Sequence, residues 1–273
     1  MKPLLIIPPA PARWPMIERI GLERPAEWWA DFKARVSEGG AGAQDAVALI
    51  APGGEALGLA CICRGGSIGV LSDIFTRPQH RGRGFARMLV GALLNWFDVT
   101  GGKTLHAAAP IDVAQRLLVP QGFEPTRRAS DAADARVTLR RGSPAGQHDE
   151  TGPGAAEVRA VLRGDWPALY DLLQHRPGPD PRVGLDESAL GAEEFLAQLS
   201  FQQRRGTCVL LVESRAERPE ALASLAVDQL GERTYAMILP HDVNSPPLRQ
   251  AVERTATERG YARVEYPLQA LAG

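Results

Sequence analysis

A run of eleven residues, Arg77–Arg87, holds two glycines and four arginines and no acidic residue. Glycine lets the main chain approach an anion closely, and arginine suits phosphate oxygens. The apolar run Ile68–Thr76 predicts a strand before it, and the amphipathic run Phe85–Phe97 predicts a helix after it. Because a strand-to-helix turn directs backbone N–H groups and the positive end of the helix dipole at one point, the sequence predicts a phosphate-binding turn.

Two familiar phosphate loops do not fit this turn. The Gly-x-x-x-x-Gly-Lys-Ser/Thr pattern of a P-loop is absent, and the third glycine of the dinucleotide fingerprint is replaced by Arg87. The acidic residue expected about 20 positions further on in that fingerprint is also missing. On its own, the remaining Gly82-x-Gly84 is a weak signal.

With its flanks the turn resembles the GNAT superfamily, the general N-acetyltransferases. Gln79–Gly84 matches the Gln/Arg-x-x-Gly-x-Gly/Ala pyrophosphate loop of that family. Leu71–Pro78 is similar to its fourth strand, and Gln121–Pro125 is similar to the Leu-Gly-Phe-Glu segment after its fourth helix. The three segments occur in the family's order and at its intervals, and the resemblance covers about residues 45 to 140.

The resemblance implies that the anion is the pyrophosphate of acetyl-CoA or of another acyl-CoA, with no metal. It implies that the turn and the helix start bind the pyrophosphate, through Arg81, Gly82, Arg83, Gly84, Phe85 and Ala86. It also implies that main chain at Phe75, Thr76 and Arg77 holds the pantetheine arm and the acyl carbonyl, and that Gln79 shapes the turn.

Acyl transfer to an amine needs a base for the amine proton, stabilisation of the thioester oxygen and a proton for the leaving thiolate. Asp73 is the first candidate for the base, because it lies within an apolar strand, where alternation places it on the face of Leu71 and Phe75. A purely structural role, bracing neighbouring backbone, also fits Asp73. His106 in the next expected strand is the second candidate, although a lone strand histidine is more often structural.

The chain departs from the family at the proton donor for the thiolate. Many members have a tyrosine four residues before the glycine of Leu-Gly-Phe, and here that position is Leu118. Leucine has no proton to donate. Either water or another group protonates the thiolate, or this half binds acyl-CoA without efficient turnover.

Trp28, Trp29 and Phe32 lie where the first helices of the family form the wall of the acceptor pocket. Aromatic faces there could attract a cationic amine, but the same spacing suits core packing, which we favour. Cys61 and Cys63 lie in an apolar run and are expected to be small buried strand residues rather than nucleophiles.

Composition narrows the class of protein. The chain has 273 residues, 44% hydrophobic and 23% charged, with a net charge of −1. That length suggests two domains. The near-neutral charge argues against nucleic-acid and membrane partners, and the lack of a leader or a long apolar run predicts a cytoplasmic protein. The 28 glycines and 22 prolines, with many alanines and arginines, suggest a GC-rich bacterial genome.

The expected fold class is α/β, with mixed, mostly antiparallel sheets flanked by helices on both faces. We expect an acyl-CoA-binding domain at residues 1–140, a linker at 141–156 that lacks large apolar residues, and a second domain at 157–273. Expected strands of the first domain are residues 3–7, 46–51, 57–63, 68–76, 104–108 and 136–140, and expected helices are 25–36, 85–97 and 111–118.

The pattern then restarts in an order that resembles a truncated second GNAT unit. Expected strands are residues 158–163, 208–213, 221–228, 234–239 and 263–267, and expected helices are 165–173, 192–203 and 245–259, the last capped by Ser245. At the place of the glycine turn stands Pro240–Pro247, without glycine or arginine, so we expect a degenerate half that binds no cofactor. An unrelated α/β domain is the alternative.

The expected activity is N-acetyl transfer from acetyl-CoA to a small-molecule amine, by a monomer or a homodimer. The alternative is a non-catalytic acyl-CoA-binding or regulatory module with the same fold.

Overall fold

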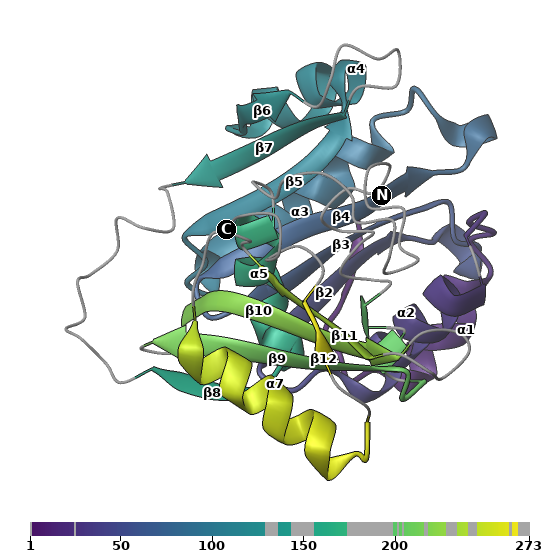
Figure 1. Cartoon of the computed structure of the whole chain (residues 1–273). Coiled ribbons are helices and arrows are strands. Elements are labelled where there is room, and N and C mark those ends of the chain that lie inside the picture. Colours follow the sequence, from purple (N-terminus) through teal and green to yellow (C-terminus); the bar gives the residue numbers. More distant parts are fainter. Residues whose placement is uncertain are drawn as a thin grey trace. The chain divides into compact units, whose positions relative to one another are not determined.

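The computed structural model of the chain describes residues 2–24, 26–128, 136–142, 156–173, 199–200, 202–203, 205–215, 218–227, 234–239, 245–261 and 264–266 (Figure 1). The expected linker lies outside the described residues except at its ends. The same holds for most of the expected helix 192–203 and for residues 240–244 of the segment expected to replace the glycine turn.

The chain forms two compact units. The first comprises Met1–Asp149 together with Leu162–Pro167, and the second comprises Glu150–Val161 and Ala168–Gly273. Each is built around one mixed sheet with flanking helices, so the expected α/β class is confirmed.

The first unit has a seven-stranded sheet in the order β1-β2-β3-β4-β5-β7-β6. All its strand pairs are antiparallel except β4–β5, which is parallel. The strands are β1 (Leu4–Ile6), β2 (Ala43–Ile50), β3 (Gly58–Gly65), β4 (Ile68–Thr76), β5 (Thr104–Pro110), β6 (Glu124–Arg128) and β7 (Arg136–Gly142). β7 therefore includes the first two residues of the expected linker.

Helices cover both faces of this sheet. One face packs on α3 (Phe85–Val99), and the other packs on α1 (Trp14–Glu18) and α2 (Ala26–Glu38). After β5 the chain makes one turn of helix, α4 (Ile111–Val113), which continues as a π-helical stretch, Ala114–Leu118. Short 3-10 turns occur at Pro11–Arg13, Pro52–Gly54, Pro78–His80, Val119–Gln121 and Arg163–Asp165.

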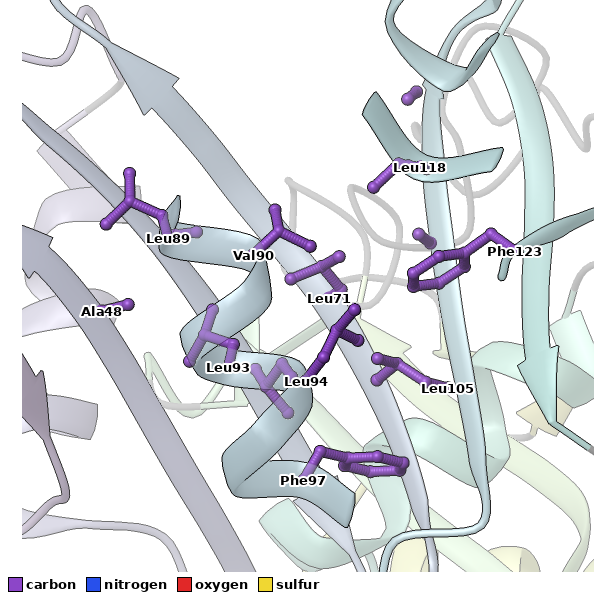
Figure 2. Packing of buried hydrophobic residues seen from close by; sticks show 14 of the residues in the cluster. Ala48, Leu71, Leu89, Val90, Leu93, Leu94, Phe97, Leu105, Leu118 and Phe123 are labelled. Atoms are coloured by element: carbon purple, nitrogen blue, oxygen red, sulfur yellow. The ribbon is translucent and has the colours of Figure 1, made fainter. Parts of the chain in front are cut away.

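The core between α3 and the sheet fixes the helix that follows the glycine turn. Leu89, Leu93 and Phe97 recur on one face of α3 and are almost completely buried. Figure 2 shows α3 directing these side chains toward the strands, with Leu71 and Leu105 opposite and Leu118 and Phe123 nearby. Burial of this apolar stripe holds the N-terminus of α3 at the end of β4.

Truncation of this core should destabilise the fold. We expect Leu93→Ala to lower the free energy of unfolding by about 2–5 kcal/mol, because it leaves a cavity in a packed interior. Val99→Ala on the last residue of the same helix, which is 73% exposed, should cost less than about 0.5 kcal/mol. Denaturant unfolding followed by circular dichroism measures both, and similar losses in the two variants would contradict this account of the core.

The parallel pair β4–β5 separates part-way along its length. Paired residues run from Ile68 with Thr104 to Leu71 with Ala107, and the pairing ends there. β4 continues to Thr76 paired with β3 alone, while β5 continues to Pro110 paired with β7. Among the described residues, the edge of β4 that faces β5 thus has no strand partner from Ser72 onward.

A β-bulge lies at the point where the two strands separate. Ser72 pairs with Cys61 and Phe75 with Leu59, so Asp73 and Ile74 together oppose Ala60. The bulge breaks the alternation assumed from the sequence: Leu71 and Ile74 pack with the α3 face, and Phe75 packs with the α1–α2 face. The sequence predicted that Asp73, Leu71 and Phe75 share one face of the sheet. This prediction was wrong, because Leu71 and Phe75 lie on opposite faces.

The second unit contains a five-stranded sheet in the order β12-β11-β10-β9-β8. Its pairs are antiparallel except β11–β12, which is parallel. The strands are β8 (Glu157–Ala160), β9 (Cys208–Arg215), β10 (Arg218–Val227), β11 (Thr234–Leu239) and β12 (Val264–Glu265). Helix α5 (Trp166–Leu173) follows β8 in the chain, and α7 (Pro246–Glu258) packs on the sheet through Leu248, Ala251, Val252 and Ala256.

Two elements of the first unit were not expected from the sequence, α1 and β6. The sequence of β6, Glu-Pro-Thr-Arg-Arg, has no apolar alternation because this strand lies at an edge of the sheet and pairs with β7 alone. Within the described ranges, the helices are all too short or too polar to span a membrane.

Candidate active site

The glycine turn has the backbone geometry expected of a phosphate cradle. Gly82 and Gly84 both have φ of +76°, in the left-handed region that side chains disfavour. A Cβ atom added to either glycine would meet no atom within 4 Å. Both positions therefore border space that no described residue fills.

The N-terminus of α3 lies directly beyond this turn. Its N-cap residue is Gly84, and no side chain accepts a hydrogen bond from the first helical turn. The first N–H groups of a helix have no partner within the helix, so they are available to an anion here. Arg81, Arg83 and Arg87 are exposed around the turn and supply positive charge. These features fit the pyrophosphate of acyl-CoA.

The remaining arginine of the run, Arg77, is bonded away from the turn. The Arg77 guanidinium donates to Glu55 Oε1 and to the main-chain carbonyl of Arg19, both at 2.5 Å. Its own N–H donates to Leu57 O at 2.9 Å. Arg77 therefore braces the end of β4, and its side chain is not directed at the turn.

The expected cofactor residues before and within the turn lie next to one another along the chain. Phe75 and Thr76 pair with Leu59 and Gly58 of β3, which leaves their other strand edge toward the β4–β5 opening. The Arg81 Nε donates to the Thr76 carbonyl at 3.3 Å and so ties the turn to the strand end. Gln79 is exposed in the 3-10 turn, and Phe85 stacks at 6.5 Å on His80. Ala86 is in the first turn of α3.

Asp73 lies at the start of the opening between the strands. Its φ of +54° is the only positive φ of a non-glycine residue in the described ranges, and its side chain is 3% exposed. Ser72 Oγ donates to Asp73 Oδ2 at 2.9 Å, and Arg24 Nη2 lies 3.6 Å from Oδ1. The buried Oδ1 has no hydrogen-bond partner among the residues that the structure describes. A buried carboxylate oxygen with unused acceptor capacity is typical of a functional site.

A second cation, Arg35 of α2, lies on the same face. Its Nε is 3.1 Å from Asp31 Oδ2. Burial lowers the pKa of Arg35, but the nearby carboxylates of Asp31, Asp45 and Asp73 outweigh this and raise the pKa above its usual value. Arg35 thus stays charged and supplies positive potential behind Asp73.

His106 lies deeper than Asp73. It is 2% exposed and pairs in register with Val70 on one side and Arg140 on the other, within the closed part of the β4–β5 ladder. Its neighbours Leu105 and Ala107 face the α3 core, so its side chain points to the opposite face. The structure places it one pair before the ladder ends, and Asp73 beyond that end.

Leu118 is completely buried in the α3 core (Figure 2). Gly122 follows with φ of +87°, which ends the helical segment, and Phe123 inserts into the same core. The position at which many relatives carry a proton donor is therefore a packing position in this chain.

The expected acceptor-wall residues form an aromatic cluster with Trp14. Ring centroids of Trp28 and Phe32 are 4.8 Å apart, and those of Trp14 and Trp29 are 5.8 Å apart. Phe32 is buried, whereas Trp28 and Trp29 are partly buried. Phe32 thus belongs to the core, and Trp28 retains an accessible face beside Arg24, whose guanidinium carbon is 5.7 Å from the ring centroid.

The cysteines are all buried. Burial, with help from the Asp45 carboxylate, raises the pKa of Cys63 to about 12, and burial raises the pKa of Cys208 to about 12. Both thiols therefore stay protonated near neutral pH, which suits packing and not nucleophilic attack. Across the described ranges no group of three or more His, Cys, Asp or Glu side chains could hold a metal ion.

Arg24 and Ser72 contact Asp73 but were not expected from the sequence. Ser72 is adjacent to Asp73 in the chain and could have been found as a local hydrogen-bond donor. Arg24 lies 49 residues earlier, in the segment between α1 and α2, and no spacing signal links it to β4.

The chain has similar solved structures and matches one family model. No curated protein matches the chain in sequence. Among solved structures, an acetyltransferase from Thermus thermophilus is 19% identical, with 52% of this chain and 97% of that chain covered at a TM-score of 0.38. A GNAT-family acetyltransferase from Staphylococcus aureus is 12% identical, with 50% and 98% covered and a TM-score of 0.38.

A spermidine N-acetyltransferase chimera of Vibrio cholerae SpeG and hSSAT is 12% identical, with 52% and 96% covered and a TM-score of 0.41. Such identities and scores are too low to transfer a substrate to this chain. The family comparison is more direct, because residues 14–123 match the model described as acetyltransferase (GNAT) family. This stretch contains the uncapped glycine turn, the strand opening and Asp73, and it is a domain of the GNAT acetyltransferase family.

Proposed function

We propose that the first unit transfers an acyl group, most simply acetyl, from acyl-CoA to a small-molecule amine. One observation carries the proposal: β4 separates from β5 directly after Leu71, and the open edge runs past Asp73 into the glycine turn. A pantetheine arm could lie along that edge while the turn holds the pyrophosphate. When bound, acyl-CoA supplies an acyl carbon activated as a thioester.

Asp73 is the proposed general base. The acceptor arrives as an ammonium ion, and Asp73 removes one proton, directly or through a water molecule, so that the nitrogen lone pair can form the C–N bond. The C–S bond breaks and its electron pair leaves with sulfur. Ser72 orients the carboxylate through Oδ2 and leaves Oδ1 toward the acceptor. His106 is the second candidate for the base.

The leaving thiolate needs a proton, and Leu118, which occupies the usual position of the donor, cannot supply it. Leu118 is buried among apolar side chains. We infer that solvent water provides this proton to the thiolate. The nitrogen releases its second proton to solvent after the C–N bond has formed. Net, one amide and one free thiol form, and one proton enters solvent.

Leu118 also favours a second candidate function, a non-catalytic acyl-CoA-binding or regulatory module. An assay of free thiol release from acetyl-CoA across a panel of amines, with calorimetry of acetyl-CoA, separates the two. Turnover with at least one acceptor supports the enzyme. Tight binding without turnover on any amine would favour the binding module.

We further propose that the second unit is a degenerate GNAT-like repeat. Its β11–α7–β12 order matches β4–α3–β5, with one parallel pair after antiparallel strands in each unit. Ser245 caps α7 by accepting from Leu248 N at 3.0 Å, and its hydroxyl donates to the buried carboxylate of Glu213. Pro246 and Pro247 contribute no N–H. The protein's own groups thus occupy the end of α7 that would meet a phosphate.

A further inference from the structure

Arg24 and Asp73 form an ion pair that leaves hydrogen-bonding capacity unused. Their closest atoms, Nη2 and Oδ1, are 3.6 Å apart, beyond the range of a charge-assisted hydrogen bond. In the described part of the chain Oδ1 has no hydrogen-bond partner, although the Asp73 side chain is only 3% exposed. Because no hydrogen bond joins them, the carboxylate can still accept a hydrogen bond from a ligand, and the guanidinium can still donate one.

The two groups differ in their access to solvent. The Arg24 side chain is 41% exposed, whereas Asp73 is almost completely buried at the start of the strand opening. The Arg24 guanidinium also lies over the ring of Trp28, with its carbon 5.7 Å from the ring centroid. A ligand in this place would meet a carboxylate on its inner side and a guanidinium on its outer side.

Neighbouring charges do not replace Arg24 as the partner of Asp73. Arg35, the other cation near Asp73, is engaged at 3.1 Å by Asp31 and is also close to Asp45. An acceptor that carried only an ammonium group would pair with Asp73 and leave the partly exposed Arg24 guanidinium to solvent water. An acceptor that also carried a carboxylate could pair with that guanidinium as well.

From this arrangement we propose that the acceptor is an α-amino acid, with its ammonium group on Asp73 and its carboxylate on Arg24. In an α-amino acid the two charged groups share one carbon, so they can bridge a guanidinium and a carboxylate that already lie side by side. The four charges then alternate in a closed ring, in which the ammonium–Asp73 and carboxylate–Arg24 contacts are charge-assisted hydrogen bonds of about 2.8 Å. The inference rests on the proposed acyl transfer and specifies its acceptor class.

The orientation has a chemical consequence. The ammonium nitrogen is held on the inner side, next to the β4 edge along which the thioester would lie, and the carboxylate stays at the more exposed mouth. Asp73 can then receive the ammonium proton without moving. Arg24 is in this account a specificity-determining residue and does not touch the reacting acyl carbon.

The test compares L-amino acids having small, acidic, basic and aromatic side chains with the carboxamide and the decarboxylated amine of each. Two readouts are used: thiol release from acetyl-CoA, and calorimetric binding of each acceptor to the chain saturated with CoA. We expect kcat/KM for the best amino acid to exceed that of its carboxamide by about 10- to 100-fold, the usual value of one charge-assisted pair.

Arg24→Ala should bring that ratio close to one, mainly through KM, and should leave acetyl-CoA binding unchanged. The matched control is Arg141→Ala, which removes another arginine paired with an aspartate, at 2.7 Å from Asp98; it should keep the full preference. Arg24→Lys, which keeps the charge but not the paired donors, should restore part of the preference.

Equal use of amino acids and carboxamides by the unchanged chain would overturn the inference. A preference that survives Arg24→Ala would also overturn it, as would the failure of every amino acid to bind the CoA-saturated chain. Turnover of amines but not of amino acids would remove the inference and keep the acyltransferase. Arg24-dependent binding of amino acids without thiol release would support the amino-acid site and count against acyl transfer.

Discussion

Replacing Gly82 and Gly84 together with alanine is expected to weaken acetyl-CoA binding by at least about a hundredfold. Each added Cβ would occupy space that is open in the structure and would shift the backbone from its φ of +76°. Loss of two charge-assisted hydrogen bonds from N–H groups to the pyrophosphate is enough for a change of this size. Isothermal calorimetry measures the affinity and should give one binding site per chain.

A matched double variant separates binding from backbone strain. Gly53 and Gly66 have φ of +62° and +56°, and a Cβ on either meets no atom within 4 Å. Gly53→Ala with Gly66→Ala should therefore cost the same strain, about 1–2 kcal/mol per residue, without touching the cradle. We expect similar thermal unfolding midpoints for the two double variants and a normal affinity only in the control. Equal affinities would refute the cradle, and a second binding site would refute a cofactor-free second unit.

Asp73→Asn is expected to lower kcat/KM by about 10²- to 10⁴-fold, the usual contribution of a general base. Acetyl-CoA affinity should stay unchanged, because Asp73 lies in β4 and not in the turn. Asparagine has the same shape and is, after glycine, among the residues best suited to the φ of +54° at this position. An alanine there would add backbone strain and confuse the result. Steady-state kinetics of thiol release with the best acceptor measures the effect.

Two further variants make this prediction specific. Asp98→Asn removes a partly exposed aspartate that pairs with Arg141, and it should leave the rate unchanged. His106→Gln tests the other candidate base. If the large loss appears in His106→Gln and Asp73→Asn keeps nearly full activity, Asp73 is not the base, although acyl transfer as such would stand.

The candidate site combines features that depend on the chain locally and features that depend on strand pairing. The glycine turn, the strand before it and the helix after it follow from contiguous residues, since glycine conformation and helix periodicity act over a few positions. The expected cap of α7 by Ser245 was confirmed for the same reason, because an N-cap serine bonds an N–H three residues on. The fold class could also be predicted from the order of such local patterns.

The orientation of Asp73, in contrast, could not be predicted from neighbouring residues. It depends on a β-bulge, which arises from the register between β3 and β4, where Asp73 and Ile74 oppose Ala60. Alternation counted along β4 alone assigns Leu71 to the wrong side for that reason. Likewise β6 has no apolar pattern of its own and forms only because β7 offers an edge.

By itself, then, the sequence determined the glycine turn between a strand and a helix, because the turn and its helix are encoded by neighbouring residues; that it holds an acyl-CoA is our proposal. Tertiary structure alone decided which groups surround Asp73. It brings Arg24, from the segment after α1, to within 3.6 Å of Asp73, and it opens β4 from β5 beside them. Both depend on packing between distant segments, whose register and distance no local spacing of residues specifies.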